Sequence, residues 1–435
     1  MKTYYIITFG CQMNKADSER LSFYLEKNSL ILAESQFKTD VLIITTCGVR
    51  QSAEDRVYSL VHQVKKKNPQ TIIVITGCLS ERKDVKSRIK NKVDIWLPIQ
   101  ELTSLISKIE ALTAAKINKS LVPGDYLAVA PKHESAFSAY IPIGNGCNNF
   151  CSYCVVPYAR GREKYRLASE IIKEVKRLIK NGYKEVILIA QNVNSYHSGR
   201  VDFVRLLMKI NDLPGDFWIR FVSSHPKDIS PKLIAALGRC SKVCEHVHFA
   251  LQSGDDDILH KMNRRYTAAH FQGLVKKIRA VGRKYKPELP LAITTDVIVG
   301  FPGETEKQFL NTVKLFKAIK FDMAYISQYS PRFGTVSYQM KDDVSKIEKK
   351  RRENVLTKIL SQTARANNKY YLKKIVPVLV EGRNRHGEWY GKTRTYKLVR
   401  INSAPVNDLS GRFVLVKINK VRDLTLEGTI IAQYE

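Results

Sequence analysis

The 435-residue sequence predicts an α/β protein with three parts: an N-terminal α/β domain on a parallel sheet, a central partial (β/α) barrel and a small C-terminal β-barrel. Three observations predict it. The chain is long for a single domain, apolar segments alternate with polar helical segments up to about residue 370, and short strand-like segments follow. We place the domains at residues 1–118, 133–370 and 371–435.

Apolar, β-rich segments at residues 4–8, 41–45, 71–75 and 93–97 mark the N-terminal sheet. Each precedes or follows a polar segment of helical length, which is the order of a parallel sheet with helical connections. The next stretch, from about residue 115 to 135, contains Pro and Gly and predicts a linker.

Six strand candidates mark the central part, and they end near Ile143, Ala190, Ser223, Gln252, Val299 and Gln328. Helical segments separate them, which predicts a barrel or partial barrel with its functional groups at the C-terminal ends of the strands. Residues 341–374 then predict a helix with one packed and one cationic face, the latter carrying Lys349, Lys350, Arg351 and Arg352.

Strand candidates at residues 376–380, 389–401, 412–421 and 424–433 predict the small C-terminal barrel. Basic residues outnumber acidic ones there, and aromatic residues lie among them. That mixture suits contacts with a nucleic-acid backbone and stacking on bases. The alternative is an ordinary barrel whose aromatic side chains fill its core.

The chain carries 72 Lys and Arg against 41 Asp and Glu, a formal net charge of +31. This charge favours a polyanionic partner, nucleic acid first and a membrane surface second. No apolar run approaches the roughly 20 residues of a membrane span, and the N-terminus lacks the features of a signal peptide. We therefore expect a cytoplasmic protein, whose eight cysteines are thiols, metal ligands or catalytic groups rather than disulfides.

Three cysteines lie close together after the first strand of the central part, with Cys147-x3-Cys151-x2-Cys154 spacing. Three thiolates on one loop suit an iron–sulfur cluster, and a 4Fe-4S cluster with three cysteine ligands leaves one iron open for a substrate or cofactor. Structural zinc would want a fourth protein ligand. An inert group of thiols is the remaining alternative.

Three further cysteines, Cys11, Cys47 and Cys78, each follow a predicted strand of the N-terminal sheet. Parallel strands bring their C-terminal ends to one edge, so these thiols can converge without a local motif and hold a second cluster. Three separately buried cysteines are the alternative. Cys240 and Cys244 have no third ligand near in sequence, and we expect ordinary core or surface thiols there.

The Cys147/Cys151/Cys154 spacing resembles the signature of the radical S-adenosylmethionine (SAM) superfamily. With the second triplet, the basic chain and the C-terminal barrel, which resembles the RNA-binding TRAM domain, the whole chain resembles the methylthiotransferases. Residues 8–19, Thr-Phe-Gly-Cys-Gln-Met-Asn-Lys-Ala-Asp-Ser-Glu, are similar to the opening motif of the MiaB branch, the tRNA isopentenyladenosine methylthiotransferases. Further matches are residues 154–163, 191–196, 251–254, 262–267 and 298–305. The chain departs from the family at Ala190 and in Arg332-Phe333-Gly334-Thr335, where the family usually has Gly and Arg-Pro-Gly-Thr.

The resemblance implies two 4Fe-4S clusters and SAM as cofactors, with Cys147, Cys151 and Cys154 holding one cluster and Cys11, Cys47 and Cys78 the other. Tyr153 matches the position of an aromatic residue near the adenine of SAM. Amides and a hydroxyl at the barrel strand ends are expected to bind SAM, with capping of their own loops as the alternative: Gln191, Asn192, Asn194, Ser223 and Gln252. The cysteines act as ligands, so no side chain is expected to be catalytic.

The resemblance also implies a reaction. The first cluster would reduce SAM to give a deoxyadenosyl radical, which removes hydrogen from the adenine carbon between the two ring nitrogens. The second cluster would supply the sulfur, methylated by a second SAM. The product would be the methylthio form of an isopentenylated adenosine beside the tRNA anticodon.

Several partners follow from this reaction. We expect a tRNA anticodon arm bound by the C-terminal barrel and the cationic helix, an electron donor such as flavodoxin or ferredoxin, no membrane, and a monomer. Arg160 and Arg162, which follow the cluster loop, are candidates for binding tRNA phosphate or for steadying the reaction site, with solvated surface charge as the alternative. The four basic residues at 349–352 are candidates for RNA phosphate contacts as well. The competing functions are the sibling enzymes for threonylcarbamoyladenosine or a ribosomal protein, and a nonenzymatic metal-binding RNA-binding protein.

Overall fold

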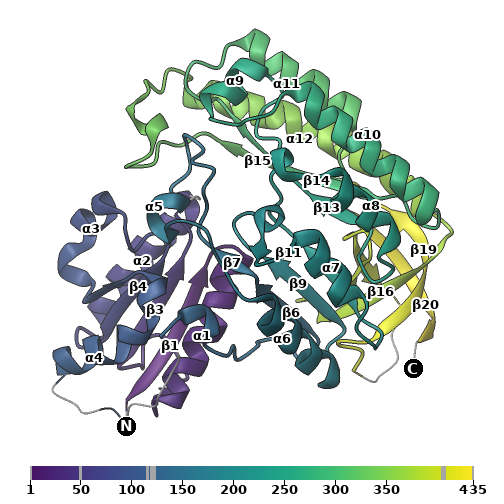
Figure 1. Ribbon diagram of the computed structural model, residues 1–435. Coiled ribbons are helices and arrows are strands. Elements are labelled where there is room, and N and C mark those ends of the chain that lie inside the picture. Colours follow the sequence, from purple (N-terminus) through teal and green to yellow (C-terminus); the bar gives the residue numbers. More distant parts are fainter. Residues whose placement is uncertain (1, 49–50, 114–116, 118–123, 403–407, 434–435) are drawn as a thin grey trace.

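The computed structural model describes residues 2–48, 51–113, 117, 124–402 and 408–433 (Figure 1). Figure 1 shows the N-terminal α/β part at one side, the central part in the middle and the C-terminal strands at the opposite side. Residues 115–116 and 118–123 of the predicted linker lie outside the described residues. Within the described ranges, no helix has the length and apolar character needed to cross a membrane.

The N-terminal sheet has five parallel strands in the order β2-β1-β3-β4-β5. Their bounds are β1 Thr3–Phe9, β2 Ile31–Leu32, β3 Val41–Thr46, β4 Ile72–Gly77 and β5 Ile95–Leu97. All four predicted strands are present, and β2 adds a two-residue edge strand that is too short to show a sequence pattern.

Helices cover both faces of this sheet because its strand residues alternate between the faces. Val41 and Ile43 pack with α1 (Gln12–Lys27) and α4 (Leu105–Thr113), whereas Leu42 and Ile44 pack with α2 (Gln51–Lys67) and α3 (Lys83–Ile89). Short 3-10 turns complete this part: η1 Lys90–Lys92, η2 Ile99–Ser104 and η3 Tyr126–Ala128. Tyr126 and Leu127 of the predicted linker are buried against the same core as α1. This part of the linker therefore belongs to the N-terminal packing.

Six parallel strands form the central partial barrel, as two three-stranded sheets, β12-β9-β6 and β13-β14-β15. Single bridges Ile219↔Val243 and Ser224↔Phe249 join the sheets beside β12 and β13. The bounds are β6 Ser138–Pro142, β9 Glu185–Ile189, β12 Trp218–Phe221, β13 His246–His248, β14 Ala292–Val299 and β15 Met323–Gln328. The predicted strand ends are confirmed within two residues, except that β13 stops four residues before Gln252.

Helices wrap the outside of the central strands (Figure 1). Their bounds are α5 Val156–Arg160, α6 Ala168–Lys180, α7 Phe203–Asn211, α8 Pro231–Arg239, α9 Asp256–Lys261, α10 Ala268–Tyr285, α11 Glu306–Ile319 and α12 Lys346–Asn368. Short elements lie in the connections: β7 Gly144–Asn145, β8 Lys164–Tyr165, β10 His197–Ser198, β11 Val201–Asp202, η4 Val193–Ser195, η5 Pro226–Asp228, η6 Val336–Gln339 and η7 Lys369–Tyr371. The packed faces of α6, α7, α8, α10, α11 and α12 form one large apolar core with the strands.

The C-terminal strands close into a barrel in the order β16-β17-β18-β20-β19. Their bounds are β16 Ile375–Arg383, β17 Trp389–Thr393, β18 Leu398–Ile401, β19 Phe413–Val421 and β20 Thr425–Gln433. The prediction of one strand over 389–401 is wrong, because the chain turns between β17 and β18 with Tyr396 at φ 64°. The barrel docks on the central domain, where the rings of Trp218 and Phe413 lie 4.7 Å apart.

Candidate functional site

The loop that carries Cys147, Cys151 and Cys154 leaves β7 through Gly146, which has φ +85°. A Cβ on Gly146 would lie 2.2 Å from the carbonyl oxygen of Arg162, so only glycine fits this close approach. The Cys147 N–H donates to the Gly161 carbonyl at 3.1 Å, and the Cys154 N–H donates to the Cys151 carbonyl at 2.9 Å. These bonds fold the three thiols into one compact loop.

Nitrogen donors point at two of these sulfurs. Arg264 Nη1 donates to Cys151 Sγ at 3.5 Å, and Asn149 Nδ2 donates to Cys147 Sγ at 3.5 Å. Burial, partly offset by a backbone bond at Asn149, raises the pKa of Cys147 to about 11, and burial followed by the neighbouring Cys151 raises the pKa of Cys154. Crowded thiols of this kind become thiolates when a cationic metal centre binds them, and donors to sulfur stabilise that state.

The second triplet lies at the C-terminal edge of the N-terminal sheet, as the sequence predicts. The Cys47 N–H donates to the Phe9 carbonyl at 2.8 Å, and the Cys78 N–H donates to the Thr46 carbonyl at 2.9 Å, so each cysteine extends the ladder of adjacent strands. Cys11 follows β1 directly and precedes α1. The three cysteines therefore come from three neighbouring strand ends, β1, β3 and β4.

Asn14, to which the sequence analysis assigned no role, connects these strand ends. Its Oδ1 accepts the Cys11 backbone N–H at 3.3 Å, and its Nδ2 donates to the Thr46 carbonyl at 3.3 Å. Cys11 keeps access to solvent, yet burial is the main cause that raises the pKa of its thiol. Both observations fit a thiol that faces an internal space, as a cluster ligand must.

The two triplets face each other across the boundary between the N-terminal and central domains. A Cβ on Gly48 would lie 3.0 Å from the Cys78 carbonyl oxygen and 3.1 Å from Val155 Cγ2, so the two domains meet at this glycine. Val155 directly follows Cys154, and the charge of Cys78 contributes to raising the pKa of Cys154. Neither cysteine motif alone predicts that the two triplets lie close together.

The donor set fits iron–sulfur clusters better than single metal ions. Among the residues described, no three Cys, His, Asp or Glu side chains are arranged to hold one metal ion. Cysteines that ligate a 4Fe-4S cluster bind different irons and stand farther apart than the ligands of one tetrahedral zinc ion. Each triplet offers sulfur ligands alone, three on one loop and three at neighbouring strand ends, and soft thiolate ligands suit iron–sulfur clusters.

Unpartnered polar atoms gather at the C-terminal ends of the central strands. Gln191 Oε1, Gln252 Oε1 and both amide atoms of Asn194 are buried without a hydrogen-bond partner. Ser223 and Gln252 also hold a left-handed backbone, at φ 68° and 67°. Strained residues and unsatisfied buried polar groups cluster at ligand sites, where a bound molecule supplies the missing bonds. These atoms fit a polar ligand such as SAM.

Asn192 is arranged differently from its neighbours. Its Nδ2 donates to Asp228 at 2.7 Å, and its Oδ1 accepts the His225 backbone N–H at 3.2 Å. Its amide therefore joins the loop after β9 to the loop after β12. This is the loop-capping role given above as the alternative to SAM binding. Tyr153 lies within the cluster loop, between Cys151 and Cys154, and packs with Phe301 and Tyr329.

Arg160 does not lie on the surface, which corrects the expectation of an RNA phosphate contact. It is 2% exposed, its guanidinium is paired with Asp17, and its Nη1 donates to Asn145 Oδ1 at 2.9 Å. Arg162 is exposed and lies over the ring of Phe150, 4.4 Å from its centroid. Only Arg162 of this pair is accessible to a nucleic acid.

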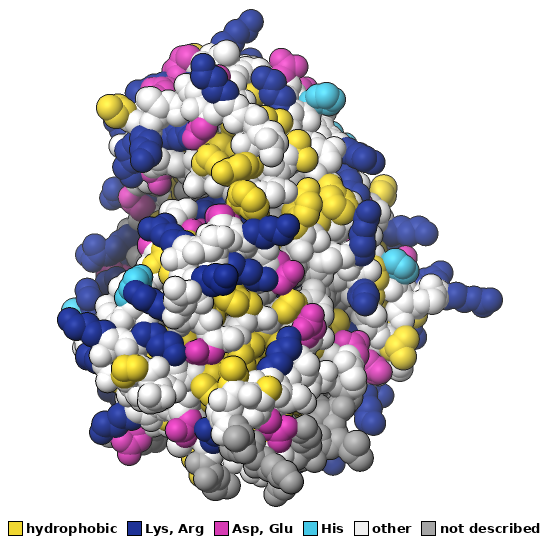
Figure 2. Space-filling view, turned by 90° about the vertical axis from the view of Figure 1, so that its left-hand side faces the viewer, with side chains coloured by type: hydrophobic (Ala, Val, Ile, Leu, Met, Phe, Trp, Pro, Cys, Tyr) yellow, Lys and Arg dark blue, Asp and Glu magenta, His cyan; other side chains and the backbone are white. Residues whose placement is uncertain are grey.

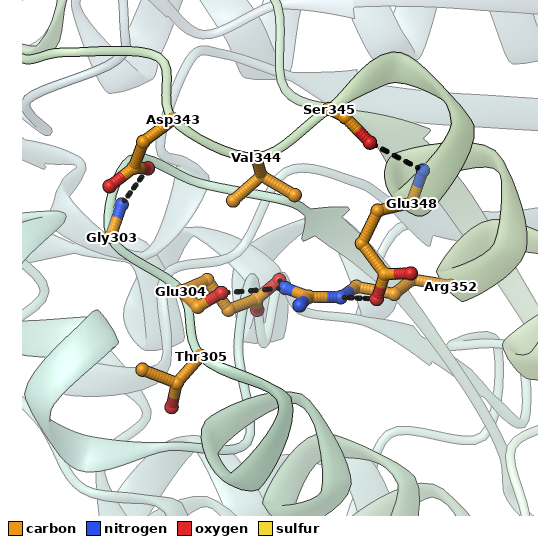
Figure 3. Close-up of a pocket in the computed structure, with 8 residues that line it drawn as sticks. All are labelled: Gly303, Glu304, Thr305, Asp343, Val344, Ser345, Glu348 and Arg352. Atoms are coloured by element: carbon orange, nitrogen blue, oxygen red, sulfur yellow. Dashed lines mark hydrogen bonds and ion pairs between the residues drawn. The ribbon is translucent and has the colours of Figure 1, made fainter.

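Lys349 and Arg352 are also buried, which corrects the prediction that all four basic residues of α12 form a cationic face. Figure 3 shows Arg352 between Glu304 and Glu348. The Arg352 guanidinium lies 2.7 Å from each carboxylate, at a cavity of about 380 Å³. Lys349 is 3% exposed and paired with Asp342. Four consecutive basic residues do not indicate which of them pairs with a buried carboxylate.

Lys350 and Arg351 keep exposed side chains, each beside a carboxylate: Lys350 beside Glu353, and Arg351 beside Glu348 and Glu306. Figure 2 shows Lys and Arg side chains over much of the face that carries the N-terminal domain, with Asp and Glu between them. The net charge is therefore spread over the surface and is not confined to α12.

Other residues were missed because their partners lie far away in sequence. Arg264 donates to Cys151 and to the Ala250 carbonyl, and Arg332 pairs with Glu54 of α2. The motifs at 262–267 and 332–335 contain these arginines, but nothing in the motifs states what the side chains contact. Cys240 and Cys244 are buried in apolar clusters, as expected of core thiols.

Three family models match the chain. They are the Radical SAM superfamily over residues 141–316, the uncharacterized protein family UPF0004 over residues 3–98 and the TRAM domain over residues 369–431. The first covers the Cys147/Cys151/Cys154 loop and most of the central strands, the second covers Cys11, Cys47 and Cys78, and the third covers the closed barrel.

Curated relatives match almost the whole chain. A tRNA-2-methylthio-N(6)-dimethylallyladenosine synthase of Clostridium novyi (strain NT) is 40% identical over 99% of this chain and 97% of its own length. The chain belongs to the tRNA-2-methylthio-N(6)-dimethylallyladenosine synthase family. Synthases of Thermoanaerobacter sp. (strain X514) and Clostridium botulinum (strain Langeland / NCTC 10281 / Type F) are 40% and 39% identical, over 98% of this chain and 92% and 96% of their own lengths. The resemblance stated from the sequence is confirmed.

Membership of this synthase family makes the chain a radical SAM enzyme with SAM and 4Fe-4S clusters as cofactors. Among solved structures, the fold is similar to the radical SAM methyltransferase TsrM from Kitasatospora setae, with a TM-score of 0.54, 12% identity, and coverage of 75% of this chain and 72% of that one. The radical SAM enzyme OxsB has a TM-score of 0.50 and 10% identity, over 82% of this chain and 56% of that one. These likenesses confirm the fold class.

Proposed function

We propose that this chain is a tRNA methylthiotransferase that converts N6-isopentenyladenosine, also called N6-dimethylallyladenosine, next to the anticodon into its 2-methylthio derivative. The names of its full-length relatives support this substrate. The observation that carries the proposal is the meeting of Cys78 and the Cys154 loop at Gly48, because sulfur transfer requires the two centres to share one substrate pocket.

Each cysteine triplet has a separate task in this function. Cys147, Cys151 and Cys154 hold the cluster that binds SAM, and Cys11, Cys47 and Cys78 hold the auxiliary cluster, the name used below for the second one. When bound, these groups supply one-electron cleavage of SAM and the sulfur that enters the adenine ring. The protein supplies the thiolates and their N–H donors, and it brings the two triplets to the place where the N-terminal and central domains meet.

The side chains at the strand ends orient SAM. The unpartnered amides of Gln191, Asn194 and Gln252 offer both donors and acceptors to its ribose, carboxylate and adenine. The Ser223 hydroxyl belongs to the same edge, where the left-handed backbone of residue 223 redirects the chain. Asn192 holds two loops together there, and Tyr153 supplies an aromatic surface within the cluster loop.

RNA binding is assigned to exposed cations and to the C-terminal barrel. Arg162, Lys350 and Arg351 offer charge to the anticodon arm, and unpaired bases can stack on exposed aromatic side chains. An acidic one-electron donor such as flavodoxin or ferredoxin reduces the cluster. We take the enzyme to be a monomer of three domains, at residues 1–118, 133–370 and 371–435, that acts in the cytoplasm on tRNA.

A substrate comparison tests this function. The anaerobically reconstituted enzyme is incubated with SAM, a reductant and one of two tRNAs, one carrying isopentenyladenosine and the other carrying threonylcarbamoyladenosine. Nucleosides are then analysed by mass spectrometry. We expect the methylthio product only from the first tRNA, and no product with the Cys147→Ala/Cys151→Ala/Cys154→Ala variant.

Other outcomes point to the competing functions. Product from the threonylcarbamoyladenosine tRNA alone assigns the sibling activity, and modification of a ribosomal protein with both tRNAs unchanged assigns the other sibling. Zinc without iron or sulfide in the purified protein favours a nonenzymatic RNA-binding protein. Each of these results would overturn the proposed substrate.

A further inference from the structure

Two buried arginines of the central domain reach into the N-terminal domain beside the auxiliary cysteines. Arg160, at the end of α5, pairs with Asp17 of α1, and both side chains are 1% exposed. Arg332, in the loop after β15, donates to Gln51 at 2.8 Å and lies 3.4 Å from Glu54 of α2, which also pairs with Arg82 of the N-terminal domain at 3.3 Å. The carboxylates of both pairs belong to the other domain.

The two pairs repeat one arrangement. Asp17 lies on the helix that follows Cys11, and Glu54 lies on the helix that follows Cys47. Asp17 lies in the second turn of α1, and Glu54 lies in the first turn of α2. Each arginine comes from a segment that the central domain places at the cysteine edge of the N-terminal sheet.

The charges of the arginines act on the cysteines themselves. Arg160 is the main group that lowers the pKa of Cys11 against the effect of burial, and the Cys78 thiol is among the groups that raise the pKa of Arg160. Arg332 interacts in the same way with Cys47. The charge of Arg160 thus acts on Cys11 and Cys78, and the charge of Arg332 acts on Cys47.

A thiolate-ligated cluster becomes more negative when it is reduced. Cationic side chains and hydrogen-bond donors close to such a cluster stabilise the reduced state, and they do so strongly in a buried site because screening by water is weak there. Asp17 opposes this effect by neutralising Arg160, and Glu54 opposes it for Arg332 and Arg82 together. The ion pairs therefore determine the net positive charge beside the cluster.

We propose that Arg160 and Arg332 are positioning residues of the auxiliary cluster, held by Asp17 and Glu54 so that two guanidiniums of the central domain complete the cysteine site of the N-terminal domain and raise its reduction potential. The auxiliary site is then complete only when the N-terminal and central domains are packed together. This inference rests on the proposed function, since it assigns the auxiliary cluster to Cys11, Cys47 and Cys78.

The test measures a potential and not turnover. In the full chain with Cys147→Ala/Cys151→Ala/Cys154→Ala, the auxiliary cluster is reconstituted alone and its midpoint potential is determined by a redox titration followed by electron paramagnetic resonance. The variants are Asp17→Asn/Arg160→Gln, which removes one charge pair, and Arg332→Gln, which removes one arginine and leaves Glu54 paired with Arg82. Both keep hydrogen-bonding side chains. We expect both to shift the potential to more negative values.

A matched control is available in the buried pair Arg220–Glu185, whose side chains are 1% and 6% exposed and which lies at the C-terminal barrel. Glu185→Gln/Arg220→Gln should leave the auxiliary potential unchanged. The proposal is overturned if both test variants keep the parental potential at full iron content, or if the control shifts it as far as they do.

Single substitutions keep the test decisive if a double variant does not fold. Asp17→Asn and Glu54→Gln retain the arginines but remove the neutralising charge, so the potential should move to more positive values. A negative shift, or none, in both overturns the proposal. Failure of the proposed function is a separate result, since unchanged tRNA with a normal auxiliary potential and a normal response to these variants would concern the substrate alone.

Discussion

Arg220 and Glu185 form a buried ion pair on neighbouring strands of the central domain, with 2.6 Å between Arg220 Nε and Glu185 Oε1. The remaining nitrogens of the guanidinium donate to the carbonyls of Thr393 and Arg394 at 2.8 Å. One side chain thus joins the central domain to the turn between β17 and β18. The C-terminal barrel is fixed to the catalytic part by a charge that has no access to water.

We predict that Arg220→Ala destabilises the protein by about 3–5 kcal/mol, because it leaves the buried Glu185 carboxylate without its cationic partner and with only the Ser138 hydroxyl donating to it among the described side chains. Trp218, whose ring packs on Phe413 of the barrel, should report the change in a urea titration followed by fluorescence. Arg351→Ala is the control, since its ion pair with Glu306 is about half exposed and such pairs contribute under about 1 kcal/mol. Equal losses in the two variants would contradict the prediction.

Gly48 has room for no side chain. Its Cβ would lie 3.1 Å from both Cys78 Cβ and Val155 Cγ2, so Gly48→Val must push the two domains apart at the point where the cysteine triplets meet. We predict that this variant folds but loses most of its methylthio product and part of its auxiliary iron. Iron and sulfide analysis with a nucleoside assay checks this.

Gly273→Ala is the matched control for Gly48→Val. Gly273 lies in α10 with nothing within 4 Å of its Cβ position, so alanine there should raise stability by up to about 1 kcal/mol and leave iron content unchanged. Normal iron content and product in Gly48→Val would show that the domains do not need their close contact at this residue.

His225 makes the stability of the protein sensitive to acid. Burial, followed by the charges of Arg264 and Lys227, lowers the pKa of His225 to about 2, and its Nδ1 accepts the Lys227 backbone N–H at 3.2 Å. The unfolded chain, with a histidine pKa near 6.5, binds the proton first as the pH falls. The stabilisation is therefore complete above about pH 6.5 and is lost toward about pH 2.

We predict that the free energy of unfolding falls below about pH 6.5 with a contribution from His225 of up to about 1.4 kcal/mol per pH unit. His225→Asn should reduce this slope, and substitution of the exposed His386 by Gln should not. Urea titrations at several pH values measure both slopes. The same slope in His225→Asn and in the parent protein would assign the acid sensitivity to other groups.

The sequence predicts those parts of the site that depend on strand order. Cys11, Cys47 and Cys78 share an edge because parallel strands end on one side, and the Gln191 and Gln252 amides lie at strand ends for the same reason. The apolar segments that define the strands are local patterns. Their consequences for the site therefore follow from local sequence and from sheet geometry.

Electrostatic partners could not be predicted in this way. Arg160 and Asp17 are 143 residues apart in the sequence, and Arg352 and Glu304 are 48 residues apart. Such pairs depend on how domains and helices pack, and an arginine in a basic run has the same local sequence whether it is buried or exposed. The RNA assignment therefore failed for Arg160, Lys349 and Arg352.

Arg162 remains an accessible cation near the cluster loop, and its charge gives the last prediction. Because it lies over Phe150 rather than in an ion pair with a described residue, Arg162→Ala removes a charge that an RNA phosphate can use. We predict weaker tRNA binding and a slope of log affinity against log salt that is smaller by about 1. Filter binding or fluorescence anisotropy over a salt series measures both quantities.

Lys67→Ala is the control because Lys67 makes the same kind of contact, 4.1 Å from the centroid of the Phe37 ring. Lys67 ends α2, which begins beside the cysteine edge of the N-terminal sheet, and so it lies toward the opposite edge. Its loss should leave the salt slope unchanged. If both variants reduce the slope equally, tRNA binding reflects the diffuse charge of the whole surface; if only Arg162→Ala does, the RNA passes over the cluster loop.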